Sequence, residues 1–161
     1  MIIGVAKETK TKENRVALTP DVIKDIVKKG FRVQVETGAG LSSFYSDETY
    51  KAAGASIVSG EELFRQTDTL LKVNPPSPEE VAKMKQGAVL ISFMWAMSSP
   101  ALVEACVKAG ITAFSMDAIP RISRAQKMDA LSSQANLGGY KAVLFAAGTI
   151  GKILPIMTPA A

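Results

Sequence analysis

Residues 70–94 read LLKVNPPSPEEVAKMKQGAVLISFM. The apolar runs 70–73 and 88–94 have the length of buried strands, and the proline-rich loop between them ends at Ser77 and Pro78, which are typical of a helix start. A helix over 79–85 then leads from one strand to the next. Two strands joined by a helix need a crossover and pair in parallel, in a sheet covered on both faces. This stretch therefore predicts an α/β fold with a parallel sheet.

The same alternation extends in both directions. A threonine, proline and aspartate at 19–21 and a serine at 59 precede apolar residues at helical spacing, while residues 31–36 alternate in the period of a strand. We expect strands at 2–6, 31–36, 55–58, 70–73, 88–94 and 112–116, and helices after Thr19, at 47–53, after Ser59, at 79–85 and at 100–109. The sequence thus predicts a Rossmann-like parallel sheet with helices on both faces.

The pattern changes after Asp117. Residues 123–145 lack proline and carry apolar residues at helical spacing, which predicts a long crossing helix beginning near Ser123. The stretch from Gly148, with Pro155 and Pro159, is typical of a linker. We therefore expect a Rossmann-like domain over 1–122, then a crossing helix and linker over 123–161 that lead toward a second domain absent from this chain.

The amino-acid composition argues against metal sites and against catalytic sites that need histidine. The 161 residues include no histidine, so the usual general acid or base near neutral pH and the commonest nitrogen ligand of metals are missing, and we expect no metal site. The single cysteine, Cys106, lies in an apolar stretch and is expected to be a buried thiol in a reducing compartment. We expect neither a signal peptide nor a membrane span, because the apolar runs are too short.

The charge pattern bears on partners. The net charge of +4 comes from lysines interleaved with acidic residues, which is typical of a solvated surface and argues against nucleic acid as a partner. A non-catalytic interaction module remains an alternative. The glycines Gly38 and Gly40 lack the third glycine of a dinucleotide fingerprint, so we interpret them as a structural turn. Any dinucleotide must then be held partly by another domain.

A polar cluster marks the start of the expected long helix. Gln126, Asp129 and Ser132 are three residues apart, a spacing that places side chains on adjacent turns of a helix. The cluster could bind one flat polar ligand, or it could be a capped and solvated first turn. Its members are Arg121, Arg124, Gln126, Asp129, Ser132, Ser133, Gln134 and Asn136.

These residues resemble a known family. The strings RISRAQ at 121–126 and MDALSS at 128–133, followed by Ala135-Asn136 and Gly139-Tyr140, are similar to the NAD(H)-binding subunit of proton-translocating nicotinamide nucleotide transhydrogenase. The strings ENRVALTP at 13–20, ETGAG at 36–40 and LLKV at 70–73 are shared more broadly with alanine dehydrogenases. The resemblance covers essentially the whole chain.

The resemblance implies a fold, a cofactor and a site. Members of the family have two Rossmann-like domains with NAD(H) in the cleft between them, and this chain resembles the first domain, without the NAD-binding second one. The resemblance assigns catalytic roles to Arg121, Gln126 and Asp129. Gln126 and Ser132 would orient the nicotinamide ring, Asp129 would pair with Arg121, and Arg121 would swing toward the second nucleotide. The implied cofactor-binding residues are Arg121, Ile122, Ser123, Arg124, Gln126, Asp129 and Ser132.

The resemblance also implies an activity and partners. The complete enzyme would be an NAD(P) transhydrogenase of the Si/Re-specific type, a translocase that moves hydride between NADH and NADP. NADP(H) would lie on a partner subunit, and membrane-embedded subunits would hold this cytoplasmic component at the inner (plasma) membrane. We expect the isolated chain to be inactive. We also expect a homodimer, because the stretch 143–157 is apolar.

The dehydrogenase branch of the family is the alternative. Arg15 and Lys72 match positions that bind a substrate carboxylate there, so an amino-acid dehydrogenase fragment stays possible. The same branch has a histidine in the loop after the strand at 88–94, where this chain has Met94-Trp95-Ala96-Met97. We therefore interpret Arg15 and Lys72 as residues that hold the geometry of a retained cleft.

Overall fold

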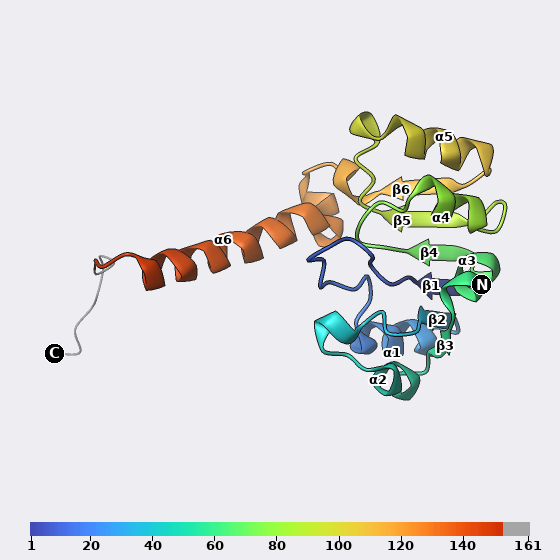
Figure 1. Ribbon diagram of the computed structural model, residues 1–161, viewed down its shortest axis with the longest axis horizontal. Helices are drawn as coiled ribbons and strands as arrows, with labels where there is room; N and C mark the ends of the chain where they lie inside the picture. The colour runs from blue at the N-terminus through green and yellow to red at the C-terminus, as the bar shows by residue number, and fades with distance from the viewer. Residues whose placement is uncertain (153–161) are drawn as a thin grey trace. The chain divides into compact units, whose positions relative to one another are not determined.

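The computed structural model describes residues 1–152, which divide into two compact units (Figure 1). Unit 1 comprises Met1–Ala118 and unit 2 begins at Ile119. The sequence placed the division at 122/123, four residues later. Residues 153–161, which include Pro155, Pro159 and much of the expected linker and apolar tail, lie outside the described residues.

Unit 1 is built on a six-stranded sheet in which every pairing is parallel, with strand order β3-β2-β1-β4-β5-β6. This is the Rossmann-like order, and it confirms the predicted fold class. The strand order reverses between β1 and β4, so the carboxyl ends of these two strands flank the crevice in which open sheets bind ligands. The strands are β1 Ile2–Val5, β2 Arg32–Glu36, β3 Ser56–Val58, β4 Thr69–Leu71, β5 Val89–Ser92 and β6 Thr112–Ser115.

Helices connect the strands at the predicted places. In α4 the Ser77 side chain accepts from the Glu80 backbone N–H while Glu80 accepts from the Ser77 N–H, a capping box that explains why a helix follows the proline-rich loop. The α-helices of unit 1 are α1 Pro20–Lys28, α2 Asp47–Ala52, α3 Gly60–Gln66, α4 Pro78–Lys83 and α5 Pro100–Lys108. Three short 3-10 helices accompany them, at Leu41–Ser43 (η1), Ala96–Ser98 (η2) and Met116–Ala118 (η3).

The core consists of two apolar clusters on opposite faces of the sheet. Gly4, Leu70 and Leu90 are in register, and because side chains alternate along a strand they face away from Val5. Leu70 and Leu90 pack with residues of α3, α4 and α5, including the buried Cys106. Val5 packs with β2 and with residues of α1 and α2. Helices therefore cover both faces, as predicted.

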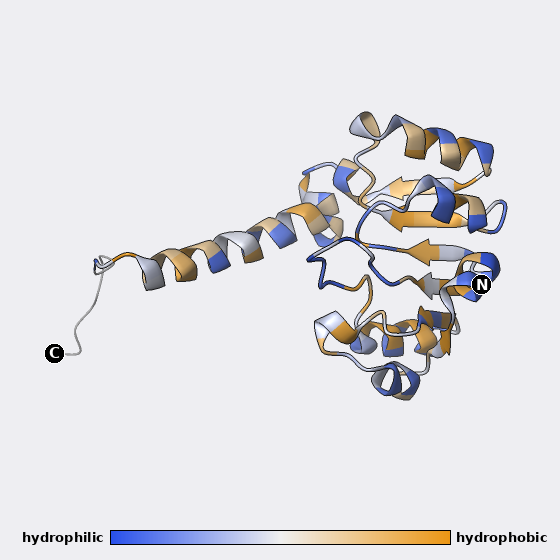
Figure 2. Cartoon of the chain, viewed as in Figure 1, coloured by the Kyte–Doolittle hydropathy of each residue, from blue (hydrophilic) through white to orange (hydrophobic). Residues whose placement is uncertain are grey.

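Unit 2 corrects the predicted start of the long helix. Residues Ser123–Met128 form a 3-10 helix (η4), and the α-helix α6 spans Ala130–Thr149. The predicted start at Ser123 was seven residues too early, because Asp129 caps α6 by accepting from the Ser132 backbone N–H at 2.9 Å. Figure 2 shows hydrophobic and polar residues mixed along α6, which has no buried residue. Among residues 1–152, no helix has the length and apolar character that a bilayer crossing needs.

Candidate functional site

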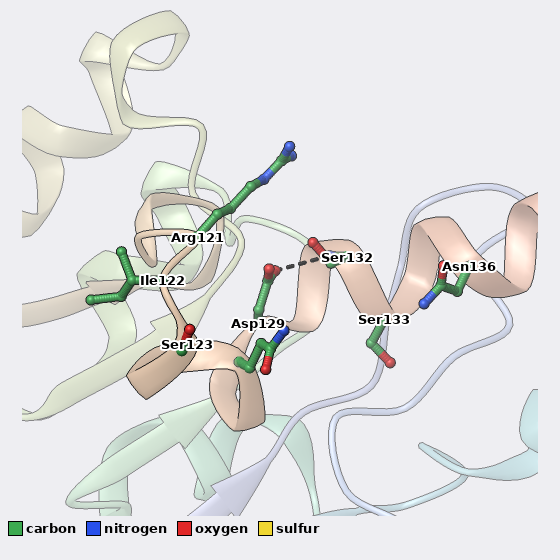
Figure 3. Close-up of a pocket in the computed structure, with 8 residues that line it drawn as sticks. Arg121, Ile122, Ser123, Asp129, Ser132, Ser133 and Asn136 are labelled. Atoms are coloured by element: carbon green, nitrogen blue, oxygen red, sulfur yellow. Dashed lines mark hydrogen bonds between the residues drawn. The ribbon is translucent and has the colours of Figure 1, made fainter.

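A polar pocket in unit 2 gathers most of the predicted site residues (Figure 3). Its volume is about 490 Å³, enough for a ring-sized ligand group. The lining comes from the segment before η4, from η4 itself and from the first two turns of α6. The lining residues are Arg121, Ile122, Ser123, Gln126, Asp129, Ser132, Ser133 and Asn136.

The local helix type explains how these residues share one pocket. A 3-10 helix has three residues per turn, so Ser123 and Gln126 of η4 lie above one another, and Asp129 at its end continues the row. In α6 the spacing becomes three to four residues, which continues the row through Ser132, Ser133 and Asn136. The polar row therefore runs along the junction of η4 and α6.

Two features of this site differ from the sequence interpretation. Arg124 lies in the same 3-10 helix but does not line the pocket. Ser133 and Asn136 do line it, although the predicted binding set omitted them. The sequence spacing could have identified both residues. Ser133 follows Asp129 by four residues and Asn136 follows Ser132 by four, and residues four apart lie on the same face of a helix.

Asp129 is the best-anchored residue of the pocket. Its carboxylate accepts from the Ser132 N–H, and hydrogen bonds from the Ser132 side chain and backbone, with a smaller contribution from the Arg121 charge, lower the pKa of Asp129 below its ordinary value. The carboxylate is therefore ionised at neutral pH. It also sits at the N-terminus of a twenty-residue helix, where negative charge is favourable.

The expected ion pair between Asp129 and Arg121 is not formed. None of the ion pairs within residues 1–152 includes Arg121. In Figure 3 the exposed Arg121 side chain extends away from Asp129. The Asp129 carboxylate is instead bonded to the Ser132 N–H, and the Arg121 guanidinium is directed toward solvent.

Unit 1 pairs the two predicted anion-binding residues with carboxylates. Arg15 contacts Glu13 at 2.6 Å, and this hydrogen bond lowers the pKa of Glu13 to about 2, although burial acts to raise it. The Lys72 side chain is 1% exposed, and its ammonium contacts the Glu80 carboxylate at 2.8 Å. Each cation thus has a counter-charge within unit 1. Sequence reasoning named the cations and missed Glu13 and Glu80.

A polar network connects these residues to the carboxyl ends of the strands. Glu8, which follows β1, accepts from the backbone N–H of Val73 at 2.6 Å and from the Asn74 side chain at 3.0 Å. Asn74 also donates to Glu13 at 2.8 Å. The network ties the end of β1 to the loop after β4, across the point where the strand order reverses. Among the residues that the structure describes, no cluster of metal-ligating side chains occurs.

Comparison with known proteins finds that this chain is similar to transhydrogenase subunits and to alanine dehydrogenases. The family model described as alanine dehydrogenase/PNT, N-terminal domain, matches residues 4–138. The NAD(P) transhydrogenase subunit alpha of Haemophilus influenzae is 47% identical over 94% of this chain and 29% of its own length. The alanine dehydrogenase of Bacillus subtilis is 36% identical, over 94% of this chain and 39% of its own length.

A solved structure agrees with the sequence relatives. The crystal structure of transhydrogenase from Sinorhizobium meliloti superposes with a TM-score of 0.91 and 42% identity, over 99% of this chain and 48% of that one. The chain therefore spans less than half the length of each of these relatives.

Proposed function

The chain belongs to the alanine dehydrogenase/PNT N-terminal domain family, and we propose that it is the first domain of the NAD(H)-binding component of a proton-translocating transhydrogenase. The complete enzyme transfers hydride between NADH and NADP with Si/Re specificity. NADP(H) is bound by a partner component, and membrane-embedded subunits hold this cytoplasmic part at the inner membrane. The contribution of this chain is the pocket that receives the nicotinamide end of NAD(H).

The observation that carries the proposal is the polar row along η4 and α6. A nicotinamide carboxamide is flat and offers both an acceptor and donors, and the row presents the Gln126 amide, the Ser132 hydroxyl and the ionised Asp129 carboxylate from consecutive turns. In the proposal, Gln126 and Ser132 orient the ring, and Asp129 fixes the junction of the two helices. Arg121, which is exposed, supplies a cation for the phosphates of a nucleotide.

The residue types suit this reaction. The bound nucleotides supply the chemistry itself, a hydride that leaves C4 of one nicotinamide ring and joins C4 of another. Such a transfer protonates no oxygen or nitrogen, so the pocket has no proton to move, and a chain without histidine is sufficient. The residues of this chain act by positioning, which in well-oriented reactions is worth several kcal/mol.

The assembly is part of the same proposal. The exposed apolar side chains of α6, which include Leu137, Val143 and Phe145, exceed what a solvated helix shows, and we propose that a homodimer covers part of them. Sedimentation that finds only monomer at high concentration would contradict the dimer.

Because the pyrophosphate cradle must come from another domain, the 161-residue chain should bind NADH very weakly. Micromolar affinity of the chain for NADH, measured by calorimetry, would contradict this division of the binding site between domains.

The test of the site uses Gln126→Asn in a subunit of the length that the relatives have. Shortening the side chain by one methylene moves the amide by about 1 Å, a misplacement that can cost about a hundredfold in rate. We expect hydride transfer to fall by that order while NADH affinity stays nearly unchanged. Gln86→Asn, the same change at an exposed position of unit 1, is the matched control. If Gln126→Asn changes neither quantity, the polar row is only a solvated cap.

A second candidate is an alanine dehydrogenase-like activity. Arg15 and Lys72 favour it, since by resemblance they match positions that bind a substrate carboxylate in that branch, and the Bacillus subtilis relative is an alanine dehydrogenase. The pairing of both cations with Glu13 and Glu80 disfavours it. The test uses a subunit as long as the relatives. Oxidation of NADH that depends on pyruvate and ammonia would support this candidate. Absence of that reaction, together with NADPH-forming activity, would exclude it.

A further inference from the structure

The strand β6 forms an open edge of the sheet in unit 1. It pairs with β5 on one side, and no strand within residues 1–152 pairs with its other side. The Thr112 N–H donates to the carbonyl of Ala88, which directly precedes β5. Because backbone groups along a strand point alternately to its two sides, the N–H and C=O of Ala113 point away from β5. An edge strand with free backbone groups is a template for pairing with another strand.

β6 carries none of the features by which proteins protect an edge strand. Its four residues, Thr112–Ser115, include no charge, no proline and no glycine, and Phe114 is 58% exposed. The opposite edge strand, β3, is three residues long and contacts α2, which exposes Glu48 and Lys51. Short length and nearby charges protect an edge. Of the two edges of this sheet, β6 is therefore the one open to pairing.

The helix beside this edge presents an apolar flank. Figure 1 shows α5 as the outermost helix at the β6 edge, and its Glu104 and Lys108 line the groove that α5 forms with α4. Val103 and Val107 are one turn apart on the flank away from that groove, and they are 37% and 74% exposed. Because α4 leads into β5 and α5 leads into β6, this flank faces outward past β6.

We propose that two copies of this chain join through β6 and α5 about a two-fold axis. In this interface β6 pairs antiparallel with β6 of the partner subunit. The Ala113 N–H of each copy donates to the carbonyl of Ala113 of the partner subunit, which satisfies the backbone groups that point away from β5. The interface involves unit 1 alone, so it rests neither on the proposed function nor on the exposed residues of α6.

The dimensions of sheets and helices favour a second copy as the occupant of this edge. α5 connects β5 to β6 and packs on the face of the sheet that carries Leu90. Neighbouring strands are about 4.8 Å apart, so an axis between β6 and its copy places the two α5 helices about 10 Å apart. Packed helices are about 8–10 Å apart, so the flanks that carry Val103 and Val107 meet across the axis.

The opposite face of β6 is complementary to itself as well. When Ala113 lies opposite its own copy, Phe114 lies opposite Thr112 of the partner subunit, and both side chains are on the face away from α5. Pairs of an aromatic and a β-branched residue across antiparallel strands are stabilising. The two-fold axis forms this pair twice, so each exposed Phe114 ring is covered without bringing a charge into the interface.

The first measurement is sedimentation of the 161-residue chain with Leu137→Lys and Phe145→Lys, two changes that remove exposed apolar side chains of α6 from any association. We expect this chain to dimerise at high concentration. Adding Val107→Lys places like charges on both sides of the axis and should raise the dissociation constant at least tenfold. Val22→Lys, the same change at an exposed position of α1, is the matched control and should leave the dissociation constant unchanged.

The second measurement is hydrogen exchange of the Ala113 amide at several protein concentrations. We expect exchange to slow at least tenfold as the dimer forms. Ala113→Pro removes this N–H on the open side of an edge strand, where sheets tolerate proline, and should raise the dissociation constant at least tenfold. Circular dichroism checks that this variant folds. If it does not, Val107→Lys still tests the interface, because residue 107 is an exposed helix position.

Three results would overturn the interface. The first is a monomer at high concentration in the chain with Leu137→Lys and Phe145→Lys. The second is an effect of Val107→Lys no larger than that of Val22→Lys. The third is slow exchange of the Ala113 amide at every concentration, which would mean that a segment of the same chain covers β6. None of these measurements involves hydride transfer, so the proposed function is tested separately.

Discussion

Unit 1 and the described part of unit 2 differ in what their side chains contact. In unit 1, two apolar clusters fill both faces of the sheet, and the charges near the strand ends are paired with one another. In residues 119–152, Ala125 is the one buried residue, and polar side chains surround a pocket. The difference teaches that the packed core of this chain and its proposed recognition residues lie in different units. Unit 1 buries two apolar clusters of its own, whereas no residue of α6 in unit 2 is buried.

The largest expected effect tests the packing side of this contrast. Leu90→Ala removes a fully buried side chain from the cluster beneath α3, α4 and α5, and should lower the free energy of unfolding by about 2–5 kcal/mol. Leu137→Ala on α6, where the leucine is 61% exposed, should change it by less than about 0.5 kcal/mol. Urea denaturation of the chain measures both. A large cost at Leu137 would mean that α6 is covered in solution.

A smaller effect is expected at a glycine of unit 1. A methyl group at Gly40 would lie 2.4 Å from the ring of the buried Tyr50 and 2.8 Å from the Tyr45 carbonyl oxygen, which is backbone and cannot easily move. Gly40→Ala should therefore destabilise the chain by about 1–3 kcal/mol through overpacking. Thermal unfolding followed by circular dichroism checks it. An unchanged melting temperature would show that the Tyr50 ring has room to shift.

The charge pairing of unit 1 predicts a dependence on pH. The hydrogen bond from Arg15 lowers the pKa of Glu13 from 4.5 to about 2, so the pair stabilises the folded state fully above about pH 4.5 and loses this contribution as the pH falls toward 2. Because Arg15 is partly exposed, solvent screening reduces the contribution to about 1–2 kcal/mol. The gap in stability between wild type and Glu13→Gln should close over this pH range. A gap that stays constant would refute the pairing.

The smallest effect is expected on α6 and has the opposite sign. Gly138 lies in the helix with nothing within 4 Å of an added methyl group outside the helix backbone. Gly138→Ala should stabilise the helix by about 0.5–1 kcal/mol, since glycine is a poor helix former. Hydrogen exchange of the α6 amides measures the change in this chain. Loss of stability instead would show that a neighbouring group packs against Gly138.

The fold could be predicted from local signals. Helix starts at Pro20, at Ser59 and at Pro78 each carry their own cap or proline, and the alternation at 31–36 identifies β2. The start of α6 was predicted wrongly, because Ser123 and Asp129 are both good caps and spacing cannot tell a 3-10 turn from an α-helical one. The hydrogen bond from the Ser132 backbone N–H to the Asp129 carboxylate identifies Asp129 as the residue that caps α6.

The candidate site was predictable only where its residues are close together in the sequence. Residues of the polar row are close in sequence, so periodicity brings them together. Glu8 lies 65 residues from Val73, and the contact between them depends on β1 and β4 being neighbours in the sheet. Likewise the pairing of Lys72 with Glu80 needs the turn of the proline-rich loop. Contacts of this kind follow from tertiary structure and leave no periodic trace.

The strand order has a consequence for how the protein is made. β1 precedes the other five strands in the sequence, yet it lies inside the sheet between β2 and β4. On the ribosome, β2 can pair with one side of β1 early, but the other side must wait for β4, whose Thr69 pairs with Ile3. At about 5–20 residues per second this wait lasts several seconds. Until β4 is made, one side of β1 is therefore an unpaired edge with free N–H and C=O groups, to which a strand of another nascent chain can pair.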